Sequence, residues 1–136
     1  MSYENFAWLH LSIILPAFFL GTFLLLNRKG TPLHKLLGKI YMCLMLLTGV
    51  ITLFMPAYIG PRIFNHFGFL HLFSLVVLVT IPMSFMAARR GDIKSHRGSM
   101  IGLYLGGILL AAAIAFFTWA HAAPAAFRLS PIFTRA

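Results

Sequence analysis

The chain has 136 residues, of which 60% are hydrophobic and only 10% are charged, and its mean hydropathy is +0.91. Charged residues make up about 25% of an ordinary soluble domain, so this composition excludes a water-soluble globular protein and indicates a membrane protein. The net charge is +9, but no stacking motif or groove-reading helix favours nucleic acid, and the basic residues are better explained by membrane topology and anionic lipid.

Four stretches without charged residues follow one another along the chain. They run at about Asn5 to Asn27, Ile40 to Pro61, Ile63 to Ala88 and Gly98 to Phe127. A helix needs about 20 residues to cross the hydrocarbon core of a bilayer, and each of these stretches is at least that long. The sequence therefore predicts an all-α, integral membrane four-helix bundle that forms a single domain over residues 1–136.

Basic residues gather in two of the three loops between these stretches. The first loop is flanked by Arg28, Lys29, Lys35 and Lys39, the third by Arg89, Arg90, Lys94 and Arg97, and the second holds Arg62 alone. Cytoplasmic loops carry an excess of Lys and Arg, so the first and third loops are predicted to lie inside and both termini outside. The first helix lacks the basic start and the cleavage site of a signal peptide.

The chain carries one chemical pattern twice. His10 precedes Arg28-Lys29-Gly30 and His34, and His71 precedes Arg89-Arg90-Gly91 and His96. This similarity predicts two tandem αα-hairpin repeats, about 6–57 and 64–122, related by a pseudo-two-fold axis along the membrane normal. The axis pairs His10 with His71 on the outer side of the membrane and His34 with His96 on the inner side. His66 and His121 lack repeat partners and are interpreted as interfacial residues or peripheral contacts to the outer site.

Paired imidazoles in membrane helices point to a metal cofactor. Neutral imidazole binds haem iron, copper or zinc, and an axis through a flat macrocycle brings one histidine to each of its faces. The membrane segments supply no carboxylate, and Cys43, the only cysteine, is interpreted as a packing residue. Haem therefore fits better than zinc, and up to two b-type haems are expected.

The inner histidines are the better candidates of the two pairs. His34 and His96 each open a helix beside basic residues, which suits haem propionates, and a helix start disfavours a charged imidazolium. Tyr41 and Tyr104 follow about two turns further on and are predicted to bond a cofactor group or a quinone oxygen, or else to anchor the bundle.

Three functions from different classes agree with these residues. The first is a haem-binding protein that transfers single electrons across the membrane, with a quinone or a redox protein as partner. The others are a non-catalytic subunit or scaffold of a larger complex and a small-solute transporter. Glycine and alanine at four-residue spacing in the last helix favour close packing within the bundle, with a homodimer interface or room for a flat cofactor as the alternatives.

A family resemblance accompanies this pattern. The run from Arg28 to Tyr41, RKGTPLHKLLGKIY, and the later Arg90-Gly91-Asp92, His96-Arg97, Met100 and Tyr104 resemble the small bacterial multi-pass membrane proteins grouped as DUF2306. That family has no settled activity, so the resemblance implies the fold, a bacterial inner (plasma) membrane and functional histidines. In the last helix, glycine and alanine replace the family's polar residues and arginine.

The arrangement of the histidines is also similar to that in the four-helix core of cytochrome b561 proteins. There, alternate helices contribute paired histidines on the two sides of the membrane. This likeness implies a one-electron carrier with two b-type haems, which passes electrons from a quinol or another reductant to an acceptor.

Overall fold

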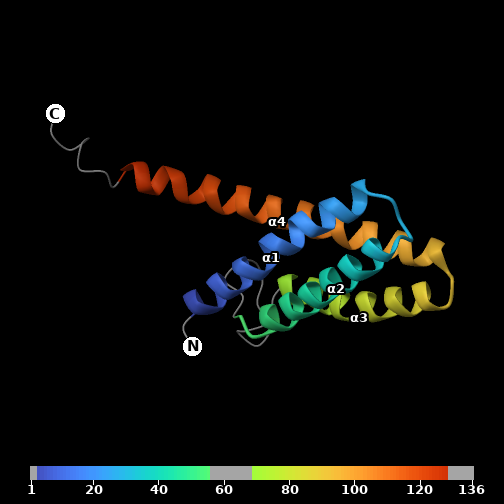
Figure 1. The fold of residues 1–136 in the computed structure, drawn as a ribbon. Coiled ribbons are helices and arrows are strands. Elements are labelled where there is room, and N and C mark those ends of the chain that lie inside the picture. The colour runs from blue at the N-terminus through green and yellow to red at the C-terminus, as the bar shows by residue number, and fades with distance from the viewer. Residues whose placement is uncertain (1–2, 56–68, 129–136) are drawn as a thin grey trace. The chain divides into compact units, whose positions relative to one another are not determined.

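The computed structural model describes residues 3–55 and 69–128, and in this part of the chain it contains only helices and their connections (Figure 1). The helices are α1 (Tyr3–Leu26), α2 (Pro32–Leu53), α3 (Phe69–Arg89) and α4 (Ile93–Arg128). The segments Asn5–Leu26, Pro32–Leu53 and His71–Arg89 are long and apolar enough to cross a membrane. The predicted all-α membrane fold is confirmed, while a fourth crossing, by the 36 residues of α4, stays a prediction.

The boundaries of α2 differ from those expected from the charge-free stretch Ile40 to Pro61. The helix begins at Pro32, ahead of Lys35 and Lys39, and ends at Leu53. Both lysines are exposed and can extend their charged ends toward the membrane interface, so their charge does not exclude them from the helix. Its end precedes Pro56, and a proline disfavours helical backbone in the residue before it. The predicted linker from about Pro56 to Asn65, with His66 after it, lies outside the described residues.

The two basic loops are built in the same way. Gly30 and Gly91 both have φ of 82°, a left-handed conformation that glycine adopts without the strain of a Cβ atom. A capping side chain follows each glycine. The Thr31 hydroxyl accepts a hydrogen bond from the His34 backbone N–H at 3.1 Å, and the Asp92 carboxylate accepts one from the Ser95 backbone N–H at 3.0 Å. These caps fix where α2 and α4 begin.

The chain divides into two compact units, residues 1–101 and 102–136. In the first unit α2 lies between α1 and α3 and contacts both of them (Figure 1). Small residues allow this packing, as is common where membrane helices approach closely. Ala17 and Gly21 are buried on α1, and a Cβ atom at Gly49 of α2 would lie 3.3 Å from the Cδ2 atom of Leu78 on α3.

The buried faces of α2 and α3 are partly polar. On α2 the buried residues recur at three- and four-residue spacing and include Thr48, which is the period of one helix face. On α3 the buried set comprises His71, Ser74, Val77, Ile81 and Ser84. Pro16 and Pro82 lie within continuous helices, on exposed faces. The core of this unit therefore holds hydroxyl and imidazole groups in helices that are otherwise apolar.

Candidate histidine sites

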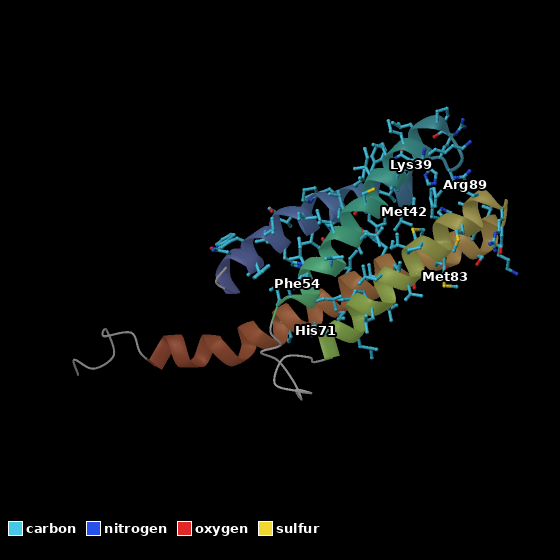
Figure 2. The ribbon with its side chains drawn as sticks, turned by 90° about the horizontal axis from the view of Figure 1, so that it is seen from below. Lys39, Met42, Phe54, His71, Met83 and Arg89 are labelled. Atoms are coloured by element: carbon cyan, nitrogen blue, oxygen red, sulfur yellow. The ribbon has the colours of Figure 1, made fainter. Side chains whose placement is uncertain are left out.

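Two ends of the helical unit can be distinguished by their residues. The basic end carries the loops 27–31 and 90–92 with their Lys and Arg side chains, and Figure 2 shows Lys39 and Arg89 toward it. The opposite end is where α2 terminates and α3 begins, and it contains Phe54 and His71 (Figure 2). Histidines occur at both ends, but their surroundings differ.

At the basic end the structure brings His34 and His96 toward each other. Each lies in the first turn of its helix, α2 or α4, and each is half-buried. The His34 ring lies within the range of electrostatic interaction with the His96 ring and with the Lys29 ammonium group. The Lys29 ammonium group itself donates a hydrogen bond to the Leu25 carbonyl at 2.6 Å. Two imidazoles and a cation thus share one small region.

The His96 ring is held by Ser84 of α3. The Nδ1 atom lies 3.0 Å from the Ser84 backbone oxygen and 3.0 Å from the Ser84 hydroxyl, and that hydroxyl also approaches the His96 carbonyl at 3.3 Å. A carbonyl oxygen only accepts hydrogen bonds, so Nδ1 must carry the proton. In the neutral ring the lone pair is then on Nε2, where a metal ion can bind it.

His34 has an unused ring nitrogen. Its Nδ1 atom is buried and forms no hydrogen bond within the described part of the chain, although its backbone N–H is satisfied by Thr31. Buried polar atoms in native structures usually have a partner, and each exception requires an explanation. A ligand between the two imidazoles is one such explanation.

The donor set at the basic end suits a cofactor that brings ligands of its own. In residues 3–55 and 69–128 no three His, Cys, Asp or Glu side chains gather closely enough to hold a metal ion by themselves. Structural zinc needs four protein ligands and catalytic zinc typically three. The iron of haem needs only one or two axial ligands from the protein, so a pair of histidines is sufficient.

At the opposite end His10 of α1 is bonded to Thr52 of α2. The Thr52 hydroxyl donates its proton to the Thr48 carbonyl at 2.7 Å and lies 3.3 Å from the His10 Nδ1 atom. A hydroxyl has one proton, so toward His10 it must accept, and Nδ1 carries the hydrogen. His10 is half-buried, whereas His71 of α3 is only 3% exposed. The pairing of His10 with His71 stays a prediction.

The predicted tyrosines occupy different settings. Tyr41 is buried on α2 at 5% exposure, and Tyr104 is half-buried and lies about two turns beyond His96 along α4. The side chain of His121, like His66, is outside what the structure describes. Sequence reasoning did not single out Ser84 or Thr48. The available signal was their polarity, since hydroxyls inside apolar membrane segments often serve a function or bridge helices.

Long apolar helices that bury a few polar side chains between them are typical of a membrane protein that crosses the bilayer several times. A model of the DUF2306 family, which comprises predicted membrane proteins, matches residues 7–135. The chain belongs to this family, which confirms the resemblance seen in its basic loops and histidines. No match was found among curated proteins or among solved structures.

Proposed function

We propose that this protein binds b-type haem in the membrane, at the basic end, through His34 and His96. The observation that carries the proposal is the bond from His96 Nδ1 to the Ser84 carbonyl. Histidines that bind metals commonly donate their second ring N–H to a backbone carbonyl, which fixes the ring and makes the other nitrogen a better ligand. The same bond leaves Nε2 as the metal-binding atom.

The charges around the pair support haem over a bare metal ion. Lys29 lies within electrostatic range of His34, and both basic loops are exposed, so they can bind the propionate groups of a haem. When bound, the haem supplies one-electron redox chemistry, whose potential depends on the axial ligands and the burial of the site. Ser84 keeps the His96 ring oriented, and both imidazoles are half-buried.

The basic end can accommodate a haem more readily than the opposite end can. His71 is enclosed at 3% exposure, so a macrocycle could approach it only after the helices separated. A single haem at His34 and His96 is therefore the form of the proposal that the geometry supports best. The protein then transfers electrons between a partner at the basic end and a donor elsewhere in the membrane.

The absorption spectrum of the purified protein tests the proposal. Expressed with ample haem, the wild type should show a Soret band in air and the sharp bands of a low-spin b-type haem after dithionite. His34→Ala and His96→Ala should remove this low-spin spectrum, and His66→Ala should leave it unchanged as the control. A wild type without a Soret band would overturn the proposal in favour of a scaffold subunit.

We propose further that the basic end lies on the cytoplasmic side of a bacterial inner membrane and that both termini lie on the outer side. The distribution of Lys and Arg supports it. In spheroplasts, a cysteine at position 2 (Ser2→Cys) should react with an impermeant maleimide, and one at position 95 (Ser95→Cys) should not, each in a Cys43→Ser background. Labelling of position 95 from outside would reverse the orientation.

A further inference from the structure

The opposite end of the unit contains a second polar group of residues that the proposed haem site does not use. His10, Thr52 and Thr48 form a chain in which His10 Nδ1 donates to the Thr52 hydroxyl at 3.3 Å and that hydroxyl donates to the Thr48 carbonyl at 2.7 Å. The chain joins α1 to α2 inside their apolar contact. We call these three residues the threonine site.

The Thr48 side chain is the unusual member. Threonine in a helix ordinarily donates its hydroxyl to the carbonyl four residues earlier, as Thr52 does to Thr48 and Thr22 does to Phe18 at 2.9 Å. Thr48 is only 6% exposed, yet its hydroxyl oxygen has no hydrogen-bond partner among the described residues. It therefore has a donor and an acceptor available in a region that water reaches poorly.

His10 supplies the complementary group. Because its Nδ1 atom donates to Thr52, its Nε2 atom carries the lone pair and can accept a hydrogen bond. The contact with Thr52 is made through Nδ1 and does not occupy Nε2. The threonine site thus offers one donor, on Thr48, and one acceptor, on His10. A ligand hydroxyl is the group that can accept from the first and donate to the second.

The location of the site selects the kind of molecule that carries this hydroxyl. His10 lies within the membrane-spanning segment Asn5–Leu26, about 24 Å along α1 from Leu26. Its neighbours in the sequence, Leu9 and Leu11, are exposed and present an apolar surface. A polar solute is poorly soluble there, and a lipid-soluble phenol is not. A phenolic hydroxyl is also a stronger hydrogen-bond donor than water, which favours it at an imidazole nitrogen.

We propose that the threonine site binds the ring hydroxyl of a lipid-soluble quinol. The hydroxyl donates to His10 Nε2 and accepts from the Thr48 hydroxyl, while Thr52 orients the imidazole. Binding of this molecule does not depend on haem. Its role as the electron donor for the haem at the basic end rests on the proposed function.

The two redox forms of one molecule provide the sharpest test. A quinone has carbonyl oxygens, which accept from Thr48 but offer no proton to His10, so the quinol should bind more tightly. Tritiated decylubiquinol and decylubiquinone are titrated under argon onto the full chain in nanodiscs, with empty nanodiscs subtracted for partition into lipid. We expect saturable binding with a Kd at least tenfold lower for the quinol.

Matched variants assign that binding to the site. Thr48→Val keeps the shape of the side chain and removes its hydroxyl, and it should raise the Kd for decylubiquinol at least tenfold. Thr52→Val should raise it less, because it releases the His10 ring without removing a contact to the ligand. Thr22→Val, at a half-buried position of α1 outside the threonine site, should leave the Kd unchanged.

The outcomes separate this proposal from the haem proposal. Wild-type nanodiscs that bind no more quinol than empty ones, or equal affinity in wild type and Thr48→Val, would overturn the quinol site and leave water as the partner of Thr48. Thr48-dependent binding to a protein without a Soret band would keep the quinol site and overturn the haem. Circular dichroism of each variant verifies that its helices are intact.

Discussion

The two ends of this unit use the same residue type for different purposes. At the basic end the His96 ring is oriented by a backbone carbonyl of a neighbouring helix, and it shares a half-buried, cationic region with His34 and Lys29. At the opposite end the His10 ring is oriented by a hydroxyl, within an apolar contact that also buries Thr48. Histidines at the two ends therefore have different surroundings and offer different chemistry.

The difference lies in which groups remain available for a ligand. The basic end offers the lone pair of His96 Nε2 and the unused Nδ1 atom of His34, which suits a metal centre, and cations that suit the acidic groups of a haem. The opposite end offers an acceptor next to an unused hydroxyl, which suits a neutral hydrogen-bonding molecule. Single substitutions at each end test this difference between the two groups of residues.

The largest effect is expected from the histidines themselves. His96→Ala removes an axial ligand, so the low-spin haem spectrum should be lost entirely, whereas His10→Ala should retain it with its band positions unchanged. Measured by reduced-minus-oxidised spectra on the two purified variants, this contrast tests the assignment of haem to the basic end. Loss of haem in His10→Ala with retention in His96→Ala would reverse the assignment.

Ser84→Ala should have an intermediate effect. The backbone carbonyl that accepts from His96 remains, but the hydroxyl that supports the same ring is gone. Loss of such a supporting group typically lowers metal affinity by about 10- to 100-fold. Haem titration of the apo-protein should show weaker binding in this range together with a shifted midpoint potential. Ser84→Thr restores a hydroxyl and should recover part of both; Ser12→Ala, on the exposed face of α1, is the control.

Substitution of Gly49 should lower the stability of the whole helical unit. A Cβ atom there meets the Leu78 side chain at 3.3 Å, so alanine requires a small shift and isoleucine a separation of α2 from α3. Overpacking of this kind costs about 1–3 kcal/mol. The free energy of unfolding, from titration of the protein in mixed micelles with sodium dodecyl sulfate, should fall by this amount in Gly49→Ile. Gly38→Ile, where a Cβ meets nothing within 4 Å, should change it much less.

The smallest effect is expected at the helix cap. Thr31→Ala removes the oxygen that accepts from the His34 backbone N–H, which should cost about 1 kcal/mol of stability. Since His34 lies in that first turn, haem affinity should fall slightly as well, whereas Thr31→Ser should preserve both properties. The same unfolding titration measures the first effect and the haem titration the second. An unchanged stability in Thr31→Ala would show that the cap does not contribute to the start of α2.

The sequence alone determined the class of this protein and the design of its loops. Hydropathy predicted the membrane helices, and the placement of Lys and Arg predicted the two basic loops between them. The left-handed glycine and the capping residue that the structure shows in RKGTP and RRGD are local properties of the backbone. The two helix starts also predicted that His34 and His96 belong to one end. The charge-free stretches Ile40 to Pro61 and Gly98 to Phe127 both begin later than α2 and α4 do, since a count of charges does not recognise a helix whose first basic residues are exposed.

Tertiary structure alone decided which hydroxyl meets which histidine. The bonds from His96 to Ser84 and from His10 to Thr52 join different helices, and their existence depends on the rotation and register of one helix against another. A sequence gives the face on which a residue lies but not the neighbour that this face meets. In this protein that neighbour fixes the protonated ring nitrogen of each bonded histidine, and with it the chemistry available at each end.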